Sequence, residues 1–317
     1  MNTEPKEFTE DEYNKKFEEL CRKGRIKFIT FHPSYSYEEF IEGITAETRA
    51  GQVNYYVKEG IFKRLCKKAL LNILKNNSIH VDEDDCKKWS KVYKVFDKHR
   101  DEIDLKKGEP FVLIIDEINR GNISKIFGEL ITLIEDDKRL GGDCEITSIL
   151  PYTRQRFGVP PNIYILATMN TADRSIALLD VALRRRFKFV EMPPEFEKMK
   201  EEAFYRDAGS GSLLHISVDA LIRINDELCK LKRIGKDRRI GHSYFWNKKD
   251  DNEVLEVWKT EILPLMEEYM YGDYEELQKC FGDKVIDKYT GVSQKITIEI
   301  LENSLKNNVL NWSPSSV

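Results

Sequence analysis

Two adjacent carboxylates at the end of an apolar run are the residues best suited to chemistry in this sequence. Residues 111–115 read FVLII, and Asp116 and Glu117 follow directly. A run that is apolar at every position predicts a strand buried on both faces of a parallel sheet, and ligands of such sheets bind beyond the carboxyl ends of the strands. One carboxylate could hold a Mg²⁺ ion that bridges nucleotide phosphates, and the other could polarise a water molecule for attack. Two solvated carboxylates at a strand end are the alternative.

A second apolar run ends close to an amide. Residues 163–168 have the composition of another buried strand, and Asn170 follows them. Ligands of open α/β sheets bind beyond the carboxyl ends of the strands, so a polar residue that follows this strand is a candidate for the same site as the two carboxylates. Asn is also a common turn residue, which is the alternative. The pairing of the two strands favours the chemical interpretation of both.

Three consecutive arginines form the third group. Arg184, Arg185 and Arg186 follow a predicted helix over residues 176–183. A guanidinium group is planar and permanently charged, which suits it to stabilise phosphoryl transfer in a neighbouring subunit's site. A favourable interaction with the end of the helix and a nucleic-acid patch are the alternatives. An arginine supplied by a neighbour requires a head-to-tail interface that closes, so this interpretation predicts a ring.

Alternating strands and helices must position these groups. The Thr9-x-x-Glu12 pattern is a capping box that opens an amino-terminal helix. The polar stretch over residues 76–108 is interpreted as a surface insertion that is helical in its middle. The other elements expected in this part of the chain are strands over residues 26–31 and 187–190, a hairpin over 43–60, and helices over 61–74 and 124–135.

The segment Met192-Pro193-Pro194 marks the predicted domain boundary. Beyond it the sequence predicts helices over about 213–231, 254–270 and 274–281, and a polar end over 303–317 that frays. The predicted fold is therefore an α/β domain in residues 1–191, with a parallel sheet flanked by helices, followed by a small all-helical domain in residues 192–317.

Composition excludes several functional classes. The 317 residues carry a formal net charge of −4, which argues against a protein that coats nucleic acid by bulk electrostatics. The six cysteines form no Cys-x-x-Cys pair, so a zinc site is not expected. The sequence has no apolar run long enough to span a bilayer and no signal peptide. We therefore expect a cytoplasmic protein without membrane contact.

Several segments together resemble the McrB-type AAA+ GTPases, the motor subunits of modified-cytosine restriction systems. The resemblance runs from about residue 25 to residue 281, and the Asn-Thr-Ala-Asp string that starts at Asn170 is its most specific part. The matching segments are IIDEINR at 114–120, MNTADRS at 169–175, ALRRRF at 182–187, FHPSYSYEEF at 31–40 and IGHSYF at 240–245. The resemblance implies an AAA+ core followed by a helical lid.

The resemblance also implies roles for individual residues. Asp116 would coordinate Mg²⁺ together with GTP or ATP, Glu117 would activate water, and Asn170 would be the sensor that positions it. Asp173, with Arg174 beside it, would belong to the nucleotide site by ordering Asn170 and the neighbour's arginines.

Further roles follow for the ring and the lid. Arg185 and Arg186 would act in trans on a neighbour's nucleotide. His242 or Arg239 would approach the nucleotide from the lid, with a hydrogen-bonded loop histidine as the alternative for His242. The implied partners are a homo-oligomeric ring, a hexamer by resemblance, and a McrC-like nuclease subunit. DNA would be contacted only through other domains.

The phosphate-binding loop of this family is not found in the sequence. Nucleoside triphosphatases of this class need Gly-x-x-x-x-Gly-Lys-Ser/Thr, whose backbone amides and lysine hold the phosphates. Gly-Lys occurs only at Gly235-Lys236 and is followed by Asp237. We expect a truncated motor, which by itself turns over neither GTP nor ATP. The alternatives are a genuine subunit or scaffold that lends arginines to a ring, and a general AAA+ ATPase of another lineage.

Overall fold

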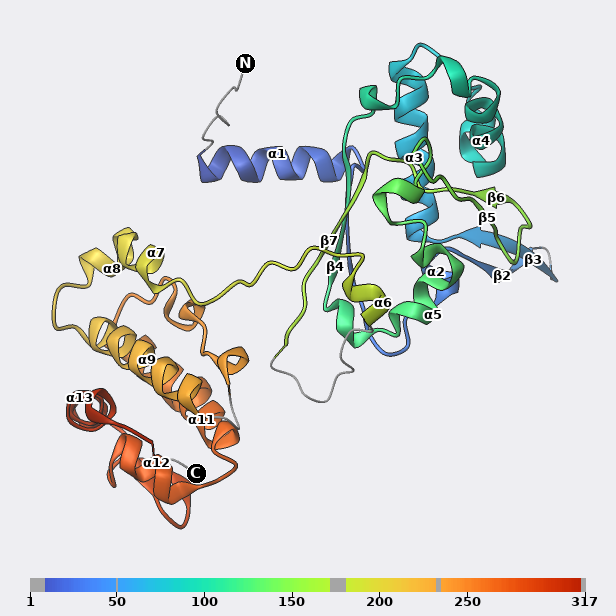
Figure 1. Cartoon of the computed structure of the whole chain (residues 1–317). Helices are drawn as coiled ribbons and strands as arrows, with labels where there is room; N and C mark the ends of the chain where they lie inside the picture. Colours follow the sequence, from blue (N-terminus) through green and yellow to red (C-terminus); the bar gives the residue numbers. More distant parts are fainter. Residues whose placement is uncertain (1–8, 50, 172–180, 232–234, 315–317) are drawn as a thin grey trace. The chain divides into compact units, whose positions relative to one another are not determined.

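The computed structural model describes residues 9–49, 51–171, 181–231 and 235–314. Contacts divide the chain into two compact units, Met1–Lys188 and Phe189–Val317, both drawn in Figure 1. We call the first the α/β unit and the second the helical unit. An α/β region followed by helices confirms the predicted fold class, whereas the domain boundary placed after residue 191 stays a prediction.

Three parallel strands form the centre of the α/β unit. In spatial order they are β1 (Ile26–Thr30), β4 (Phe111–Asp116) and β7 (Ile163–Ala167). The register pairs Thr30 with Asp116 and Ile115 with Ala167. The strands therefore end together, and the sequence predictions for all three are confirmed.

One face of this sheet packs into a hydrophobic core. The helices on this face are α3 (Ile61–Asn76), which lies beside the sheet in Figure 1, and α4 (Trp89–Lys98), which packs against α3. The apolar face of α4 is buried, with Trp89, Val92 and Phe96 at 0–1% exposure. The prediction of a surface insertion over residues 76–108 is therefore wrong for this helix. Its polar residues point outward, and they dominated the composition on which the prediction rested.

The other face of the sheet is open within the part of the chain that the structure describes. Phe28, Tyr164 and Leu166 are 60%, 56% and 59% exposed. They lie on the same face as Val112 and Ile114, which are half-buried. The prediction that β4 is buried on both faces is wrong here, although its composition suits such a strand. We call these five side chains the open face.

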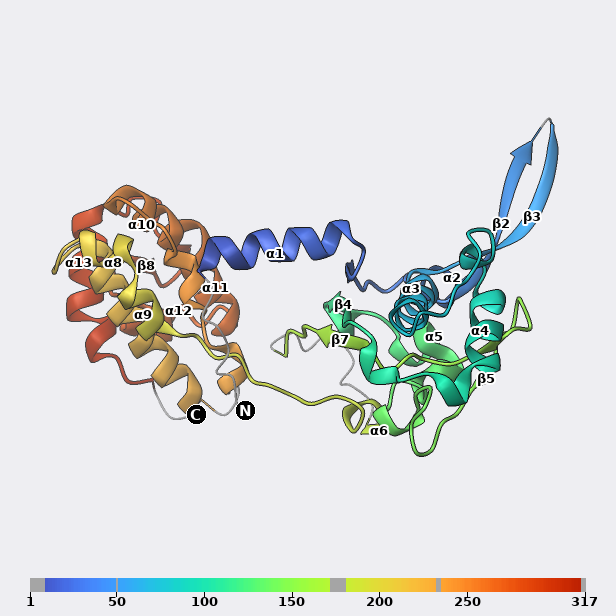
Figure 2. The same cartoon turned by 90° about the horizontal axis from the view of Figure 1, so that it is seen from above.

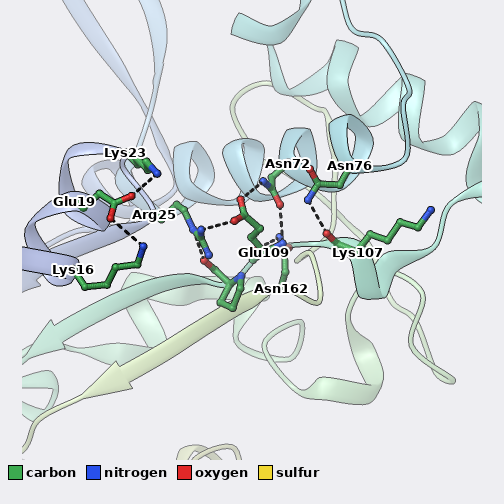
Figure 3. A network of polar contacts seen from close by, with 10 residues as sticks. Lys16, Glu19, Lys23, Arg25, Asn72, Asn76, Lys107, Glu109 and Asn162 are labelled. Carbon is green, nitrogen blue, oxygen red and sulfur yellow. Dashed lines mark hydrogen bonds and ion pairs between the residues drawn. The ribbon is translucent and has the colours of Figure 1, made fainter. Parts of the chain in front are cut away.

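The amino ends of the three strands are joined by a polar network (Figure 3). The Arg25 guanidinium donates to Glu109 Oε1 at 2.7 Å, and the Asn72 amide donates to Glu109 Oε2 at 3.0 Å. Asn162 donates to the backbone oxygens of Glu109 and Ala69 at 2.9 and 3.2 Å. Since these residues precede the strands or lie on α3, the network fastens α3 to this end of the sheet.

A long hairpin leaves the unit after β1. A short helix, α2 (Tyr37–Phe40), leads into the antiparallel strands β2 (Glu42–Arg49) and β3 (Gln52–Glu59), as predicted. Figure 2 shows this ribbon extending away from the sheet. At its base, a Cβ on Gly60 would lie 2.3 Å from the backbone of Phe40. Only glycine allows the two chain segments to approach so closely.

The hairpin base contains a buried ion pair. Glu42 and Lys63 are both 0% exposed, and Lys63 Nζ donates to Glu42 Oε2 at 2.7 Å. The same carboxylate accepts the backbone amides of Tyr152 and Thr153 at 3.1 and 2.9 Å and the Thr153 hydroxyl at 2.8 Å. Both oxygens are therefore fully used. Burial by itself raises the pKa of Glu42, but the bonds from Lys63 and Thr153 outweigh it and lower that pKa.

Two predicted elements of the α/β unit differ from the structure. The helix expected over residues 124–135 is shorter, because α5 (Ile123–Phe127) ends at Gly128, which has φ of +53° and continues as a 3-10 turn. No strand forms over residues 187–190, where Phe189 and Val190 are 46% and 79% exposed. A strand requires a paired neighbour, and this segment pairs with none of the three described strands of the sheet.

The amino-terminal helix has the predicted capping box. In α1 (Glu10–Arg22) the Thr9 side chain accepts the Glu12 amide, and Glu12 reaches back to the Thr9 amide. The helix has no buried residue, and Tyr13 and Phe17 are 58% and 47% exposed. The Lys23 and Lys16 ammonium groups lower the pKa of the Glu19 carboxyl to about 2 (Figure 3).

Smaller elements complete the α/β unit. They are the two-residue strands β5 (Ser148–Ile149) and β6 (Arg156–Phe157) and the helix α6 (Val181–Arg184). Arg139 is 9% exposed and donates to the backbone oxygen of Ile134 at 2.9 Å and to that of Ile163. It thereby ties the segment before β5 to the start of β7.

The helical unit has its own core. Leu221, Trp258, Phe281 and Leu305 are each 0% exposed within it. Its main elements are α7 (Phe196–Glu201), α8 (Ala203–Asp207), α9 (Leu213–Lys230), α10 (Asp251–Val257), α11 (Leu263–Tyr269), α12 (Tyr274–Phe281), α13 (Ile298–Asn307) and the short pair β8 (Ile286–Asp287) and β9 (Gly291–Val292). None of the helices in the described part of the chain is long and apolar enough to cross a membrane.

The carboxyl-terminal part of this unit is more ordered than predicted. The sequence predicts fraying over residues 303–317, yet α13 extends to Asn307, and Val309 and Trp312 are buried. The Trp312 indole donates to Glu276 at 3.2 Å. Buried apolar residues spaced among polar ones hold this segment against α9 and α12, which composition alone does not reveal.

Candidate active site

The carboxyl ends of β4 and β7 bring the predicted chemical groups together. Asp116 is the last residue of β4, and Glu117 follows it. Asn170 lies three residues beyond Ala167, the last residue of β7. Since β4 and β7 are hydrogen-bonded neighbours, the two carboxylates and the amide share one edge of the sheet. This is the edge at which ligands of parallel sheets bind.

Glu117 has a strained backbone. Its φ and ψ are 53° and 48°, in the left-handed region that costs a residue with a Cβ about 1–2 kcal/mol. Its Oε2 atom is buried and accepts no hydrogen bond in the described structure, but it forms an ion pair with Arg120 Nε at 3.4 Å. Strained backbone and an unsatisfied polar atom at one residue are typical of functional sites rather than of stabilising contacts.

Thr168 joins the two strands at this point. Its hydroxyl donates to Asp116 Oδ1 at 2.6 Å and accepts the Glu117 amide at 3.1 Å. This residue was not predicted from the sequence. A threonine just beyond a strand is unremarkable in the sequence, and only the register between β4 and β7 places it against the carboxylates.

Asn119 supports the segment that follows β7 by bonding to the backbone of Asn170. Its side-chain amide donates to the backbone oxygen of Asn170 at 3.1 Å, and the residue is 9% exposed. Its own Oδ1 has no hydrogen-bond partner in the described structure. Asn119 therefore fixes the backbone that carries the exposed Asn170. The remaining residues of the signature string, Asp173 and Arg174, lie outside the described residues.

The three arginines differ in their surroundings. Arg184 ends α6, and Arg185 next to it is exposed. Arg186 is only 7% exposed in its side chain and pairs with Glu135 at 2.8 Å from its Nε atom. Of the predicted trans-acting pair, Arg185 therefore has the accessible charge, and Arg186 is held within its own unit.

His242 lies in the helical unit. Its Nδ1 atom accepts the backbone amide of Glu195 at 3.1 Å, and its ring packs edge-on against Phe196 and Trp246. These contacts fit the alternative of a hydrogen-bonded loop histidine. Arg239 donates to Glu191 at 2.7 Å, and Lys236 and Arg239 together lower the pKa of that carboxyl. A role for either residue at the nucleotide stays a prediction.

The groups present suit a magnesium ion better than they suit a whole nucleotide. Within the described ranges, no three His, Cys, Asp or Glu side chains form a site that could hold a metal by themselves. Mg²⁺ in nucleotide sites is commonly held by one or two carboxylates, with phosphates and water as the other ligands. Asp116 fits that pattern. The sequence offers no Gly-x-x-x-x-Gly-Lys-Ser/Thr loop to hold the phosphates.

Comparison with known proteins gives a consistent result across both units. A family model described as "AAA domain (dynein-related subfamily)" matches residues 12–187, and one described as "McrB, alpha-helical lid domain" matches residues 217–278. The chain is 35% identical over 266 residues to the Type IV methyl-directed restriction enzyme EcoKMcrB subunit of Escherichia coli (strain K12), covering 80% of this chain and 49% of that protein.

A second relative comes from another restriction system. The chain is 28% identical over 211 residues to the Type II restriction enzyme BsuMI component YdiS of Bacillus subtilis (strain 168). That match covers 61% of this chain and 60% of the relative. The chain thus spans between about half and three fifths of the length of these two proteins.

Proposed function

The chain belongs to the McrB-type family of AAA+ proteins, and on this premise we propose that it carries the hydrolytic part of a nucleotide-driven motor in a restriction system. The observation that supports this most strongly is the shared edge of β4 and β7. There, Asp116 and the strained Glu117 lie beside the segment that carries Asn170. A strained residue with an unsatisfied carboxylate oxygen suits a group that acts on a ligand.

Each residue has a role in this proposal. Asp116 would hold Mg²⁺, which when bound supplies positive charge against the phosphates of GTP or ATP. Glu117 would accept a proton from the attacking water through its Oε2 atom, which accepts no hydrogen bond and pairs only with Arg120 at 3.4 Å. Asn170 orients that water through its side chain. Asp173 and Arg174 keep their proposed place at the nucleotide.

The proposed role of the arginines requires that the motor is an oligomer. Arg185 is exposed and could reach a nucleotide bound by a neighbouring subunit, whereas Arg186 would first have to leave Glu135. We therefore assign the trans-acting role to Arg185 and a supporting role to Arg186. A closed homo-oligomeric ring follows from such a head-to-tail contact. A McrC-like nuclease subunit is the proposed partner, with DNA contacted through other domains.

The phosphate-binding loop must come from outside these 317 residues in this proposal. The open face supports that view, because β4 has the composition of a strand covered on both sides while Phe28, Tyr164 and Leu166 stay exposed. A further strand and helix that carry the loop could pair with β7 and cover this face. They could belong to the same polypeptide or to another subunit.

Nucleotide turnover by the polypeptide from the complete reading frame tests the proposal. We expect Mg²⁺-dependent release of phosphate, a loss of at least about 100-fold in Glu117→Gln, and a similar loss in Arg185→Ala. Lys188→Ala, which removes a nearby exposed cation, should leave the rate unchanged. A Glu117→Gln protein that hydrolyses at the unchanged rate would contradict the assignment.

A second candidate is favoured by the sequence itself. Because no phosphate-binding loop is found, the chain could be a ring subunit that binds no nucleotide and only supplies Arg185 to its neighbour. Nucleotide binding to the complete protein separates the two. A scaffold subunit binds neither GTP nor ATP, and its Glu117→Gln variant supports the neighbour's turnover as well as the parent does.

A further inference from the structure

Thr168 makes hydrogen bonds to four successive residues of the neighbouring strand and turn. Its backbone amide donates to the Ile115 oxygen at 2.9 Å, and its backbone oxygen accepts the Ile118 amide at 3.0 Å. Between these two bonds, its hydroxyl donates to Asp116 Oδ1 at 2.6 Å and accepts the Glu117 amide at 3.1 Å. One residue thus fixes the whole turn that carries both carboxylates.

We propose that Thr168 is a positioning residue, whose hydroxyl sets the directions of the Asp116 and Glu117 side chains relative to each other. This inference rests on the proposed function of those carboxylates. A hydroxyl has one proton and free lone pairs, so a single group can donate to Asp116 while it accepts from Glu117. Movement of either residue then changes the bond to the other.

The bond to Asp116 selects one carboxylate oxygen. Oδ1 accepts the Thr168 proton, which fixes the rotation of the carboxylate and therefore the direction in which Oδ2 faces a cation. The bond from Glu117 holds the peptide of a residue whose left-handed backbone costs energy. Without that bond the turn could relax toward an ordinary conformation, and the Glu117 carboxylate would point elsewhere.

Simple satisfaction of buried polar groups does not explain this hydroxyl. Thr168 is exposed, so water could bond to the Glu117 amide and to Asp116 in its absence. What water cannot supply is a fixed direction, because it is not attached to β7. The arrangement therefore favours a geometric role over a role in stability.

Two substitutions separate these roles in the 317-residue chain. Thr168→Val keeps the branched shape and removes the hydroxyl, whereas Thr168→Ser keeps the hydroxyl. By amide hydrogen exchange, we expect the Glu117 amide to exchange about ten times faster in Thr168→Val and near the parent rate in Thr168→Ser. The Leu113 amide, within β4, should exchange at the parent rate in both. Unchanged exchange at Glu117 in Thr168→Val, or an equal increase at Leu113, would overturn the proposal.

Turnover by the complete protein supplies a second readout. Thr168→Val should lower kcat about 10- to 100-fold with little change in KM for the nucleotide, since misplaced groups slow chemistry more than they weaken binding. Thr168→Ser should recover most of kcat. If kcat is unchanged in Thr168→Val while Glu117→Gln is inactive, the positioning role is wrong and the proposed function stands. If Glu117→Gln is fully active, the proposed function is wrong, and hydrogen exchange still decides whether Thr168 fixes the turn.

Discussion

Glu42 and Glu117 belong to the same unit, but their carboxylates differ in the hydrogen bonds that they accept. Glu42 has no exposed surface, and its two oxygens accept four hydrogen bonds from Lys63, Tyr152 and Thr153. Glu117 lies in a strained backbone conformation, and its Oε2 atom accepts no hydrogen bond in the described structure. Glu42 holds the hairpin base through these hydrogen bonds, whereas the Oε2 atom of Glu117 has only the ion pair with Arg120 at 3.4 Å. Satisfaction of the carboxylate, more than its burial, distinguishes a structural acid from a candidate catalytic one.

The largest test of this comparison removes the partner of Glu42. Lys63→Met should lower the free energy of unfolding of the α/β unit by about 3–5 kcal/mol, because it leaves a buried carboxylate without its cation. Hydrogen exchange of the β4 amides measures the loss within this unit. Arg64→Met is the matched control, since Arg64 is the next residue and is exposed, and it should change stability by less than about 0.5 kcal/mol. Equal losses of stability in Lys63→Met and Arg64→Met would mean that the buried ion pair contributes no more to stability than the exposed arginine does.

Acid should produce a related, pH-dependent loss. The folded-state pKa of Glu42 is lowered, so its contribution is present above the unfolded carboxyl pKa of about 4.3 and is lost as pH falls through the folded pKa. We expect the stability difference between the parent and Glu42→Gln to be constant from pH 7 to pH 5 and to shrink below about pH 4. A difference that grows on acidification would contradict the direction of this pKa shift.

A smaller effect of opposite sign is expected at Glu117. Glu117→Gly should stabilise the α/β unit by about 1 kcal/mol, because glycine adopts the left-handed region without a Cβ clash. Glu117→Ala removes the same carboxylate but keeps the Cβ, so its stability should match the parent within about 0.5 kcal/mol. Urea unfolding of the three proteins measures both differences. Destabilisation by glycine would show that Glu117 is not strained and would weaken the contrast with Glu42.

The smallest effect should come from a third carboxylate, Glu109 at the amino end of the sheet. It pairs with Arg25 and Asn72, but its side chain is 51% exposed. Glu109→Gln should therefore cost at most about 1 kcal/mol, and most of this cost should disappear in high salt. Unfolding measured at low and high salt tests both statements. A salt-independent loss as large as that of Lys63→Met would remove the distinction between buried and exposed pairs.

Much of this site could be predicted from the sequence because its signals are local. An apolar run followed by Asp116 and Glu117, and another followed closely by Asn170, identified two strands and their common edge. The hairpin, α3 and the capping box of α1 were also predicted, since each depends on a periodic pattern or a cap within a few residues. Each of these signals lies in one continuous segment.

The rest depends on contacts between segments. Thr168 could not be selected, because its partners are set by the register of β4 and β7. The left-handed backbone of Glu117 is hidden in the sequence, which has no Gly or Asn at that position. The ion pair of Glu42 and Lys63 joins distant segments. The helix predicted over residues 124–135 was too long, because Gly128 interrupts an apolar pattern that otherwise continues.

The open face lies next to an outer strand of the sheet in the described part of the chain. Its outer strand, β7, reads IYILA, and it carries none of the lysines, prolines or glycine bulges with which natural proteins protect a strand edge. Among the described residues no strand pairs with the outer edge of β7, and such an edge favours pairing with another extended segment. Solubility in concentrated samples, and the yield of correctly folded chain during synthesis, will therefore depend on how soon this edge is capped.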